Sequence, residues 1–281
     1  MDKLIIGVWQ GVCRDGDVEA NLARTVQVVD EAAAAGCDFV CLPEQFLAGY
    51  ALPGLGERCA MTLDDRRLLS LAQHADTRSV VTLLGLIERR GDRFANTQVI
   101  LEDGRVAGHY TKTMPTEGDW ELMGFHDDEL PVFDLRGLCF GIIICHDSSF
   151  PEVAATLAWK GARVIFSPHY NSLPRPRMDS HRKVVRNNHV GIAAHYGLVV
   201  ARSNVVGTWP EKDLLGYGDS AIFGPDGEPI AEAGLFTETL ITADVAPHLN
   251  APRWAHRSEL RPAVIEQLAQ AAREALGKGR P

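Results

Sequence analysis

The chain has 281 residues and a formal net charge of −9. This charge argues against nucleic acids and anionic membranes as partners, because both attract basic patches. Hydrophobic residues make up 46% of the chain and charged residues 23%, as in soluble globular proteins. The sequence shows no apolar run as long as a membrane span, no signal-peptide pattern and no regular cysteine framework. We therefore expect a cytoplasmic protein.

In chain order, the first half alternates predicted strands and helices. A buried strand over 3–12 precedes a helix that Asp17 caps and Gly36 ends, and the apolar residues of this helix recur at helical spacing. The next predicted elements are strand 38–42, helix 63–75, strands 79–87 and 95–101, a hairpin turn at 102–105 and strand 106–112. Residues 113–130 are polar, acidic and aperiodic, which predicts a long loop.

The second half begins with a predicted strand pair and then alternates again. Its predicted elements are strands 131–135 and 138–144, helix 152–160, strand 163–166, a Pro-rich loop 167–177, helix 179–194, strands 198–203, 220–223, 229–233 and 239–244, and an amphipathic helix 261–276. Helices on the outer faces of two mixed sheets would bury the apolar faces. One such α/β arrangement is a four-layer αββα sandwich, built from a single domain over 1–281 with the last helix as an extension.

Three chemically capable residues each follow a predicted strand: Glu44, Lys112 and Cys145. Taken singly, each has an ordinary structural explanation. A cysteine that closes an apolar strand is usually buried and inert, and a charged residue at a strand end is usually solvated. The three placements together point to a site at the edge of the sheet, where α/β proteins bind ligands.

The segments around these residues resemble the nitrilase superfamily of carbon–nitrogen hydrolases, over nearly the whole chain up to about residue 245. The matching stretches are Leu42-Pro43-Glu44 with Gly49-Tyr50, Ala95-Asn96-Thr97 through Tyr110-Thr111-Lys112-Thr113, Gly141-Ile142-Ile143-Ile144-Cys145-His146-Asp147 with Phe150-Pro151-Glu152, and Gly218-Asp219-Ser220. The resemblance implies a homodimer of αββα sandwiches that acts on a small molecule. We expect no cofactor and no metal.

The resemblance also implies that Glu44, Lys112 and Cys145 form a catalytic triad. Cys145 would attack a carbonyl carbon and form a thioester, while Glu44 takes the thiol proton and passes it to the departing ammonia or amine. Lys112 would stabilise the oxyanion together with the backbone N–H of His146.

Members of the superfamily usually carry a second glutamate beyond the lysine. Glu117, Glu121 and Glu129 all lie in the predicted loop, and we favour Glu121 from its distance to the following strand. A cluster of acidic residues in the same loop is interpreted as a solvated face or, alternatively, as a pocket mouth that favours a cationic or neutral substrate. Its members are Asp119, Asp127, Asp128 and Glu129.

Cys145 is followed by His146, which resembles the amidase and N-carbamoyl hydrolase branches more than true nitrilases. Some members of the superfamily carry an arginine shortly after the cysteine, where it binds a substrate carboxylate. This chain has Ser148 and Ser149 at those positions, although Arg175 and Arg177 could supply such a contact. The residues expected to border the cleft are Tyr50, Trp120, His146, His169, Tyr170 and Asn171.

The favoured function is hydrolysis of a small carboxamide or N-carbamoyl amine. The alternatives are a nitrilase, an acyltransferase that uses the thioester, and a binding or regulatory module without turnover. A dinucleotide site is rejected, because the loose G-x-G-x-x-A pattern over 216–221 leads into a strand instead of a helix. The spacing of His181, His189 and His195 does not match a zinc-binding pair on a helix.

Overall fold

The computed structural model describes residues 2–50, 54–210, 213–249 and 261–277. Its elements are β1 (Ile5–Val12), α1 (Val18–Ala34), β2 (Phe39–Cys41), α2 (Leu55–Cys59), α3 (Arg66–Thr77), β3 (Val81–Arg90), β4 (Arg93–Glu102), β5 (Arg105–Thr111), α4 (Glu117–Leu122), β6 (Val132–Leu135), β7 (Leu138–Ile142), η1 (Cys145–Ser149), α5 (Pro151–Trp159), β8 (Val164–Pro168), β9 (Ser172–Leu173), α6 (Arg175–Tyr196), β10 (Val199–Ser203), β11 (Val205–Trp209), β12 (Leu214–Phe223), β13 (Pro229–Leu235), β14 (Thr239–Asp244), α7 (Ala246–Leu249) and α8 (Pro262–Gly277).

The strands form one large mixed sheet that folds back on itself. Hydrogen-bonded neighbours follow the order β5-β4-β3-β2-β1-β11-β12-β10-β8-β7-β6, with β13 and β9 paired to β12 and β14 paired to β1. The strands β11 and β12 connect the two halves. The halves pack face to face over a core in which the ring of Phe140 from β7 lies 5.7 Å from Phe39 of β2 and 5.3 Å from Phe166 of β8.

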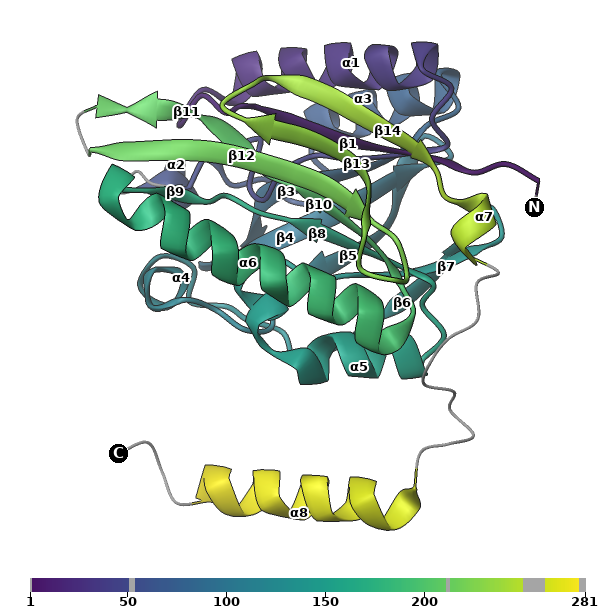
Figure 1. Cartoon of the computed structure of the whole chain (residues 1–281). Helices are drawn as coiled ribbons and strands as arrows, with labels where there is room; N and C mark the ends of the chain where they lie inside the picture. Colours follow the sequence, from purple (N-terminus) through teal and green to yellow (C-terminus); the bar gives the residue numbers. More distant parts are fainter. Residues whose placement is uncertain (1, 51–53, 211–212, 250–260, 278–281) are drawn as a thin grey trace.

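Two helical layers cover the outer faces of this folded sheet (Figure 1). The helices α1 and α3 pack on the β1–β5 half, where Val28 and Leu71 join the apolar cluster around Val40. The helices α5 and α6 pack on the other half, where Leu157 and Ile192 belong to one cluster. The predicted α/β fold class is therefore confirmed as an αββα sandwich, with the refinement that its two sheets are continuous through β11 and β12.

Local signals explain both the correct and the incorrect element predictions. The Asp17 side chain accepts a hydrogen bond from the N–H of Ala20, so the predicted cap of α1 is confirmed. The predicted long loop 113–130 is wrong in part, because a capping box between Thr116 and Asp119 starts α4. The Pro-rich loop 167–177 contains β9 and the first turn of α6, since proline is well tolerated at the start of a helix.

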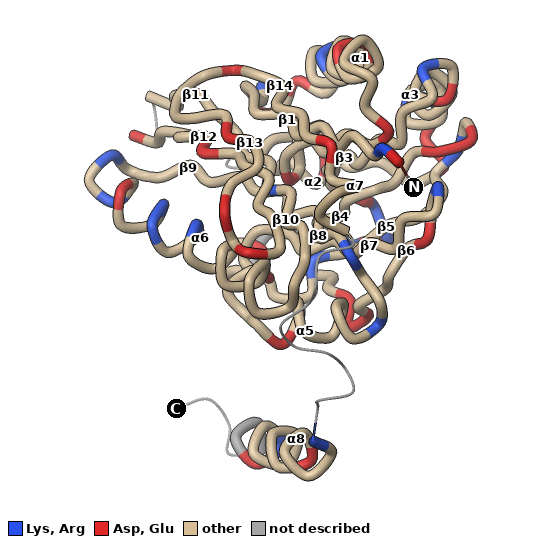
Figure 2. The backbone as a smooth tube through the Cα atoms, turned by 45° about the vertical axis from the view of Figure 1, so that its right-hand side comes forward, with Lys and Arg blue, Asp and Glu red and all other residues tan. Residues whose placement is uncertain are grey.

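The charged positions lie mainly on helices and connections, with both signs interspersed and few charges along the central strands (Figure 2). In the part of the chain that the structure describes, no helix is long and apolar enough to cross a membrane. The helix α8 was expected over 261–276, and its apolar residues Val264 and Leu268 are 57% and 52% exposed. The single domain, the homodimer and the cytoplasmic location stay predictions.

Candidate active site

The folded sheet brings the three predicted triad residues together from distant strands. Glu44 follows β2, Lys112 follows β5, and Cys145 begins η1 just beyond β7. Lys112 Nζ lies 2.8 Å from Glu44 Oε1, and both side chains are only 1% exposed. The thiol of Cys145 interacts with the carboxylate of Glu44 and with the charge of Lys112. The chain segments that resemble the family thus meet at one buried place.

A second carboxylate completes the charge cluster around Lys112. Asp119 Oδ2 lies 2.8 Å from Lys112 Nζ, and its side chain is also 1% exposed. Burial alone would lower the pKa of Lys112, but the negative charges of Glu44 and Asp119 oppose burial and raise it well above its usual value. Burial likewise opposes ionisation of Asp119, yet the adjacent ammonium holds the pKa of that carboxyl below its usual value. Lys112 is therefore a fixed positive charge in the site.

Both oxygens of the Glu44 carboxylate are held in place. Oε1 accepts a hydrogen bond of 2.7 Å from Asn96 Nδ2 in addition to the bond from Lys112. Oε2 accepts a hydrogen bond of 2.9 Å from the backbone N–H of Tyr170. A carboxylate fixed at both oxygens has a defined direction for proton transfer, which a general base requires.

Cys145 occupies an unusual backbone conformation, with a φ angle of 49°. Such a left-handed conformation is strained in a residue other than glycine, and it persists only where the surroundings enforce it. Three hydrogen bonds to the Asp147 carboxylate enforce it. Oδ2 accepts one of 2.7 Å from the N–H of Ile144 and one of 2.8 Å from the hydroxyl of Tyr110. Oδ1 accepts one of 2.8 Å from the N–H of Met114. The buried Asp147 therefore clamps the turn that presents the thiol.

The thiol of Cys145 is protonated in the resting site. Burial raises the pKa of Cys145 well above its usual value, and the negative charge of Glu44 raises it further, while Lys112 opposes both. Because only the thiolate is a strong nucleophile, the thiol needs a proton acceptor when it reacts. Glu44 is placed to be that acceptor.

Among the described residues, the second acidic side chain in contact with Lys112 is Asp119, and the assignment of the second family glutamate to Glu121 stays a prediction. The interpretation of Asp119 as part of a solvated acidic face or pocket mouth is therefore wrong, since its carboxylate is buried on Lys112. Glu117 and Glu129 are exposed. The favoured Glu121 lies in α4, and its side chain falls outside what the structure describes. The spacing of Thr116 and Asp119, which is that of a capping box, was the available signal.

Three of the predicted binding residues lie directly at the triad. The hydroxyl of Tyr50 donates a 3.0 Å hydrogen bond to Asp119 Oδ1, and Lys112 Nζ lies 5.8 Å from the centre of the Tyr50 ring. Tyr170 stacks on Tyr50 at 5.7 Å between ring centroids. Asn171 Nδ2 donates to Cys145 Sγ at 3.5 Å.

The other predicted binding residues make different contacts. His146 Nδ1 bonds to the carbonyl oxygen of Met114 at 3.2 Å. His169 is buried, with hydrogen bonds to Ser167 at 3.0 Å and His189 at 3.1 Å, so it supports the loop after β8. Trp120 is 55% exposed, and its ring packs edge-on against His126. Arg175 and Arg177 are both exposed in the first turn of α6.

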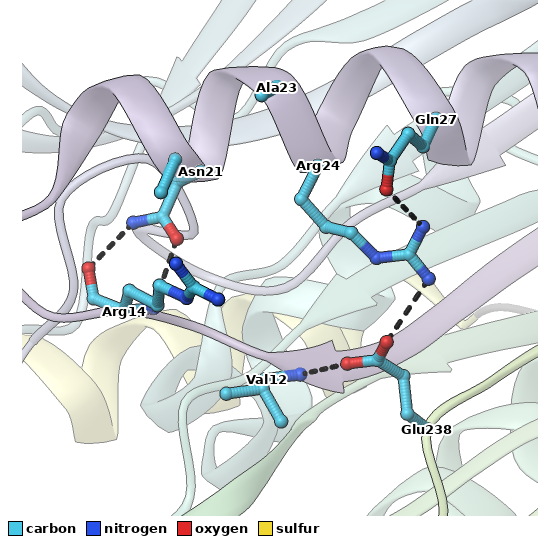
Figure 3. Close-up of a pocket in the computed structure, with 8 residues that line it drawn as sticks. Val12, Arg14, Asn21, Ala23, Arg24, Gln27 and Glu238 are labelled. Carbon is cyan, nitrogen blue, oxygen red and sulfur yellow. Dashed lines mark hydrogen bonds and ion pairs between the residues drawn. The ribbon is translucent and has the colours of Figure 1, made fainter.

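A separate pocket of about 480 Å³ lies between α1 and the strands beneath it, and none of the triad residues lines it. Figure 3 shows Arg24 bonded to Gln27 of the same helix and reaching across the pocket to Glu238. The other carboxylate oxygen of Glu238 accepts a hydrogen bond from the N–H of Val12. Arg24 and Glu238 are thus partners of each other in this pocket. In the described ranges, no group of three or more His, Cys, Asp or Glu residues is placed to hold a metal ion.

Comparisons with known proteins identify the family of the chain. The family model described as carbon-nitrogen hydrolase matches residues 5–251. An (R)-stereoselective amidase from a Pseudomonas species is 30% identical, over 79% of this chain and 77% of the relative. The glutamine-dependent NAD(+) synthetase of Thermotoga maritima is 29% identical over 82% of this chain, but the matched region spans only 40% of the length of that relative.

Among solved structures, the amidase from Nesterenkonia sp. AN1, in a complex with acrylamide, superimposes with a TM-score of 0.80. It shares 20% sequence identity, with 95% of this chain and 98% of that chain covered, and so supports the fold. The family match covers nearly all of the sandwich and ends before α8. The chain therefore belongs to the carbon-nitrogen hydrolase family, in the amidase-like branch of the nitrilase superfamily.

Proposed function

We propose that this protein hydrolyses the C–N bond of a small linear carboxamide or N-carbamoyl amine through a thioester on Cys145. The observation that carries the proposal is the buried contact of Glu44 with Lys112 at 2.8 Å, beside a thiol that interacts with the carboxylate of that same Glu44. Glu44 can thus accept a proton from the sulfur, while the adjacent Lys112 cation stabilises the negative charge that develops on the substrate oxygen.

In the first half-reaction, Glu44 takes the proton from the Cys145 thiol as the sulfur forms a bond to the carbonyl carbon. The carbonyl π electrons move to oxygen, and the oxyanion is stabilised by Lys112 together with the N–H of His146. The intermediate collapses, and the C–N bond breaks. The leaving nitrogen takes the proton from Glu44 and departs as ammonia or amine, which leaves a thioester and an ionised Glu44.

In the second half-reaction, Glu44 removes a proton from a water molecule that attacks the thioester carbon. A second oxyanion forms at the same place and collapses, which breaks the C–S bond and expels the sulfur. The proton held by Glu44 returns to the thiolate, so that the acid is released and the resting site is restored. Asp119 holds Lys112 in place through both steps.

The test is ammonia release from a panel of small amides, N-carbamoyl amines and nitriles, with mass spectrometry for an acyl adduct on Cys145. We expect turnover of at least one amide or carbamoyl amine, and none by Cys145→Ala. Cys139→Ala is the matched control, because Cys139 and Cys145 are the two partly exposed cysteines in the described chain. Full activity of Cys145→Ala would refute the mechanism, and turnover of a nitrile without its amide would replace the substrate class.

A further inference from the structure

The amide of Asn171 is held in one orientation by two donors. Its Oδ1 accepts a hydrogen bond of 3.0 Å from Arg202 Nη2 and one of 3.1 Å from the hydroxyl of Tyr217. Its Nδ2 therefore faces the other way, where it donates to Cys145 Sγ at 3.5 Å. A flipped amide would set its own N–H groups against both donors and leave an oxygen facing the sulfur. Arg202 and Tyr217 thus determine which atom of Asn171 meets the nucleophile.

Arg202 is a charged residue in a fully buried strand, which is rare. It lies in β10, a strand of five buried residues, and is 1% exposed. A buried guanidinium is costly unless its donors are bonded and its charge is paired. Nη1 donates to the carbonyl oxygens of Gly218 and Asp219, and it lies 3.9 Å from Asp219 Oδ2. Nη1 is thus bonded and the charge is paired, while Nε has no hydrogen-bond partner among the described residues.

A bulge in β12 provides those carbonyl oxygens. Gly218 and Asp219 have φ angles of 76° and 63°, and the register between β12 and β13 shifts at this point. A Cβ atom on Gly218 would lie 2.5 Å from Cδ of Gln10, so only glycine fits. The glycine pattern over 216–221, rejected above as a dinucleotide site, thus has a structural role in binding Arg202.

We propose that Arg202 is a positioning residue: with Tyr217, it holds Asn171 so that the amide N–H, and not the amide oxygen, faces the sulfur of Cys145. The inference rests on the proposed function, in which the sulfur is negatively charged as it attacks and again as water expels it. A directed N–H stabilises the thiolate on both occasions. Arg202 touches no reacting atom and acts through the orientation of a neutral amide.

The decisive variant is Asn171→Asp, because a carboxylate keeps the shape and both accepted hydrogen bonds but replaces the N–H with an oxygen. The readout is the rate of Cys145 alkylation by iodoacetamide as a function of pH, followed by mass spectrometry of the Cys145 peptide. We expect a rate at pH 7 at least about tenfold lower and a titration midpoint about one pH unit higher, as for a lost hydrogen bond to a charged group.

Arg202→Met should slow the alkylation in the same direction by about tenfold, and Tyr217→Phe by about threefold, since each removes a donor that fixes the amide. Arg202→Lys should recover part of the loss, because it restores the charge without the fork of donors. The control is Arg186→Met, which removes another guanidinium near Asp219, at 3.6 Å, whose described contacts do not include Asn171. We expect no change in that variant.

The same variants distinguish this inference from the proposed function. In amide hydrolysis, kcat should fall while KM stays within about twofold, because the contact is to sulfur and not to substrate. Wild-type alkylation profiles in folded Asn171→Asp and Tyr217→Phe would overturn the inference, even if Arg202→Met does not fold. Slowed alkylation in a protein that hydrolyses no amide would instead support the positioning role and refute the proposed function.

Discussion

Lys112 and Arg24 each bridge two carboxylates, yet they do so in opposite surroundings. Lys112 lies 2.8 Å from each of its partners, and all three side chains are 1% exposed. Arg24 lies 2.8 Å and 3.1 Å from its partners, and its own side chain is 24% exposed. The partners are Glu44 and Asp119 in the first region and Glu31 and Glu238 in the second. Figure 3 shows Arg24 with Glu238.

A cation between two carboxylates therefore does not by itself mark a reactive site, whereas burial of all three charges does. Exposed pairs contribute about 0–1 kcal/mol to stability, because water screens the charges and solvates each side chain well on its own. Buried charges lose their hydration, so they destabilise the fold unless each one is paired with a partner of opposite charge. Buried charges that also shift one another's pKa values are characteristic of reactive sites.

The largest effect is expected from Lys112→Met, which leaves two buried carboxylates without their cation. We expect the free energy of unfolding to fall by about 3–5 kcal/mol, as for other broken buried pairs, and amide hydrolysis to be lost. Urea unfolding and ammonia release measure the two quantities. Wild-type stability in this variant would mean that the charges at the site are solvated, and it would remove the contrast with Arg24.

A pH-dependent effect is expected at Asp147, where burial raises the pKa of the carboxyl from 3.8 to about 6. The folded protein then binds this proton more tightly than the unfolded chain, so the contribution to stability is greatest below pH 3.8 and is lost as pH rises through 6. Relative to Asp147→Asn, which does not titrate, wild type should lose about 2 kcal/mol of unfolding free energy between pH 4.5 and 7.5. Urea unfolding at both pH values tests this, and a difference that grows with pH would contradict it.

A smaller effect separates Asp119 from Glu121. Asp119→Asn should lower kcat by about tenfold, because Lys112 loses one of its two charged partners and the amide nitrogen faces a donor. Glu121→Gln is the comparison, since Glu121 was the residue favoured from sequence. Steady-state kinetics on the best amide measures both. A larger loss of kcat in the Glu121 variant would support Glu121 as the second acidic residue of the site.

The smallest effect is expected from Arg24→Met, the counterpart of Lys112→Met in the exposed region. Stability should change by no more than about 1 kcal/mol, and kcat/KM should stay at the wild-type value. The same urea and ammonia assays apply. A loss of activity here would show that the pocket of Figure 3 takes part in the reaction.

The sequence predicted the residues that follow strands better than those that come from irregular segments. Glu44, Lys112 and Cys145 could be located because each follows a predicted strand, in a segment that resembles the family. Asp119 could not, since one short helix within an acidic stretch carries little periodicity. Its capping-box spacing was nonetheless readable.

The residues behind the nucleophile were missed for a different reason. Arg202 follows Val199-Val200-Ala201, and a charge in such a buried strand was a signal that something must pair with it. The pairing itself depends on the bulge of β12, whose glycines break the alternation of a strand, so the predicted strand began at 220 instead of Leu214. Contacts between segments this far apart require the tertiary fold.

The continuity of the sheet through β11 and β12 has a mechanical consequence. The strands that precede Glu44, Lys112 and Cys145 belong to one uninterrupted hydrogen-bonded path, so the catalytic groups cannot be hinged apart without breaking backbone bonds. The framework that carries the catalytic groups is therefore expected to move as one rigid body. Heating should accordingly abolish activity and melt the sheet in a single cooperative step, with no inactive yet folded species in between.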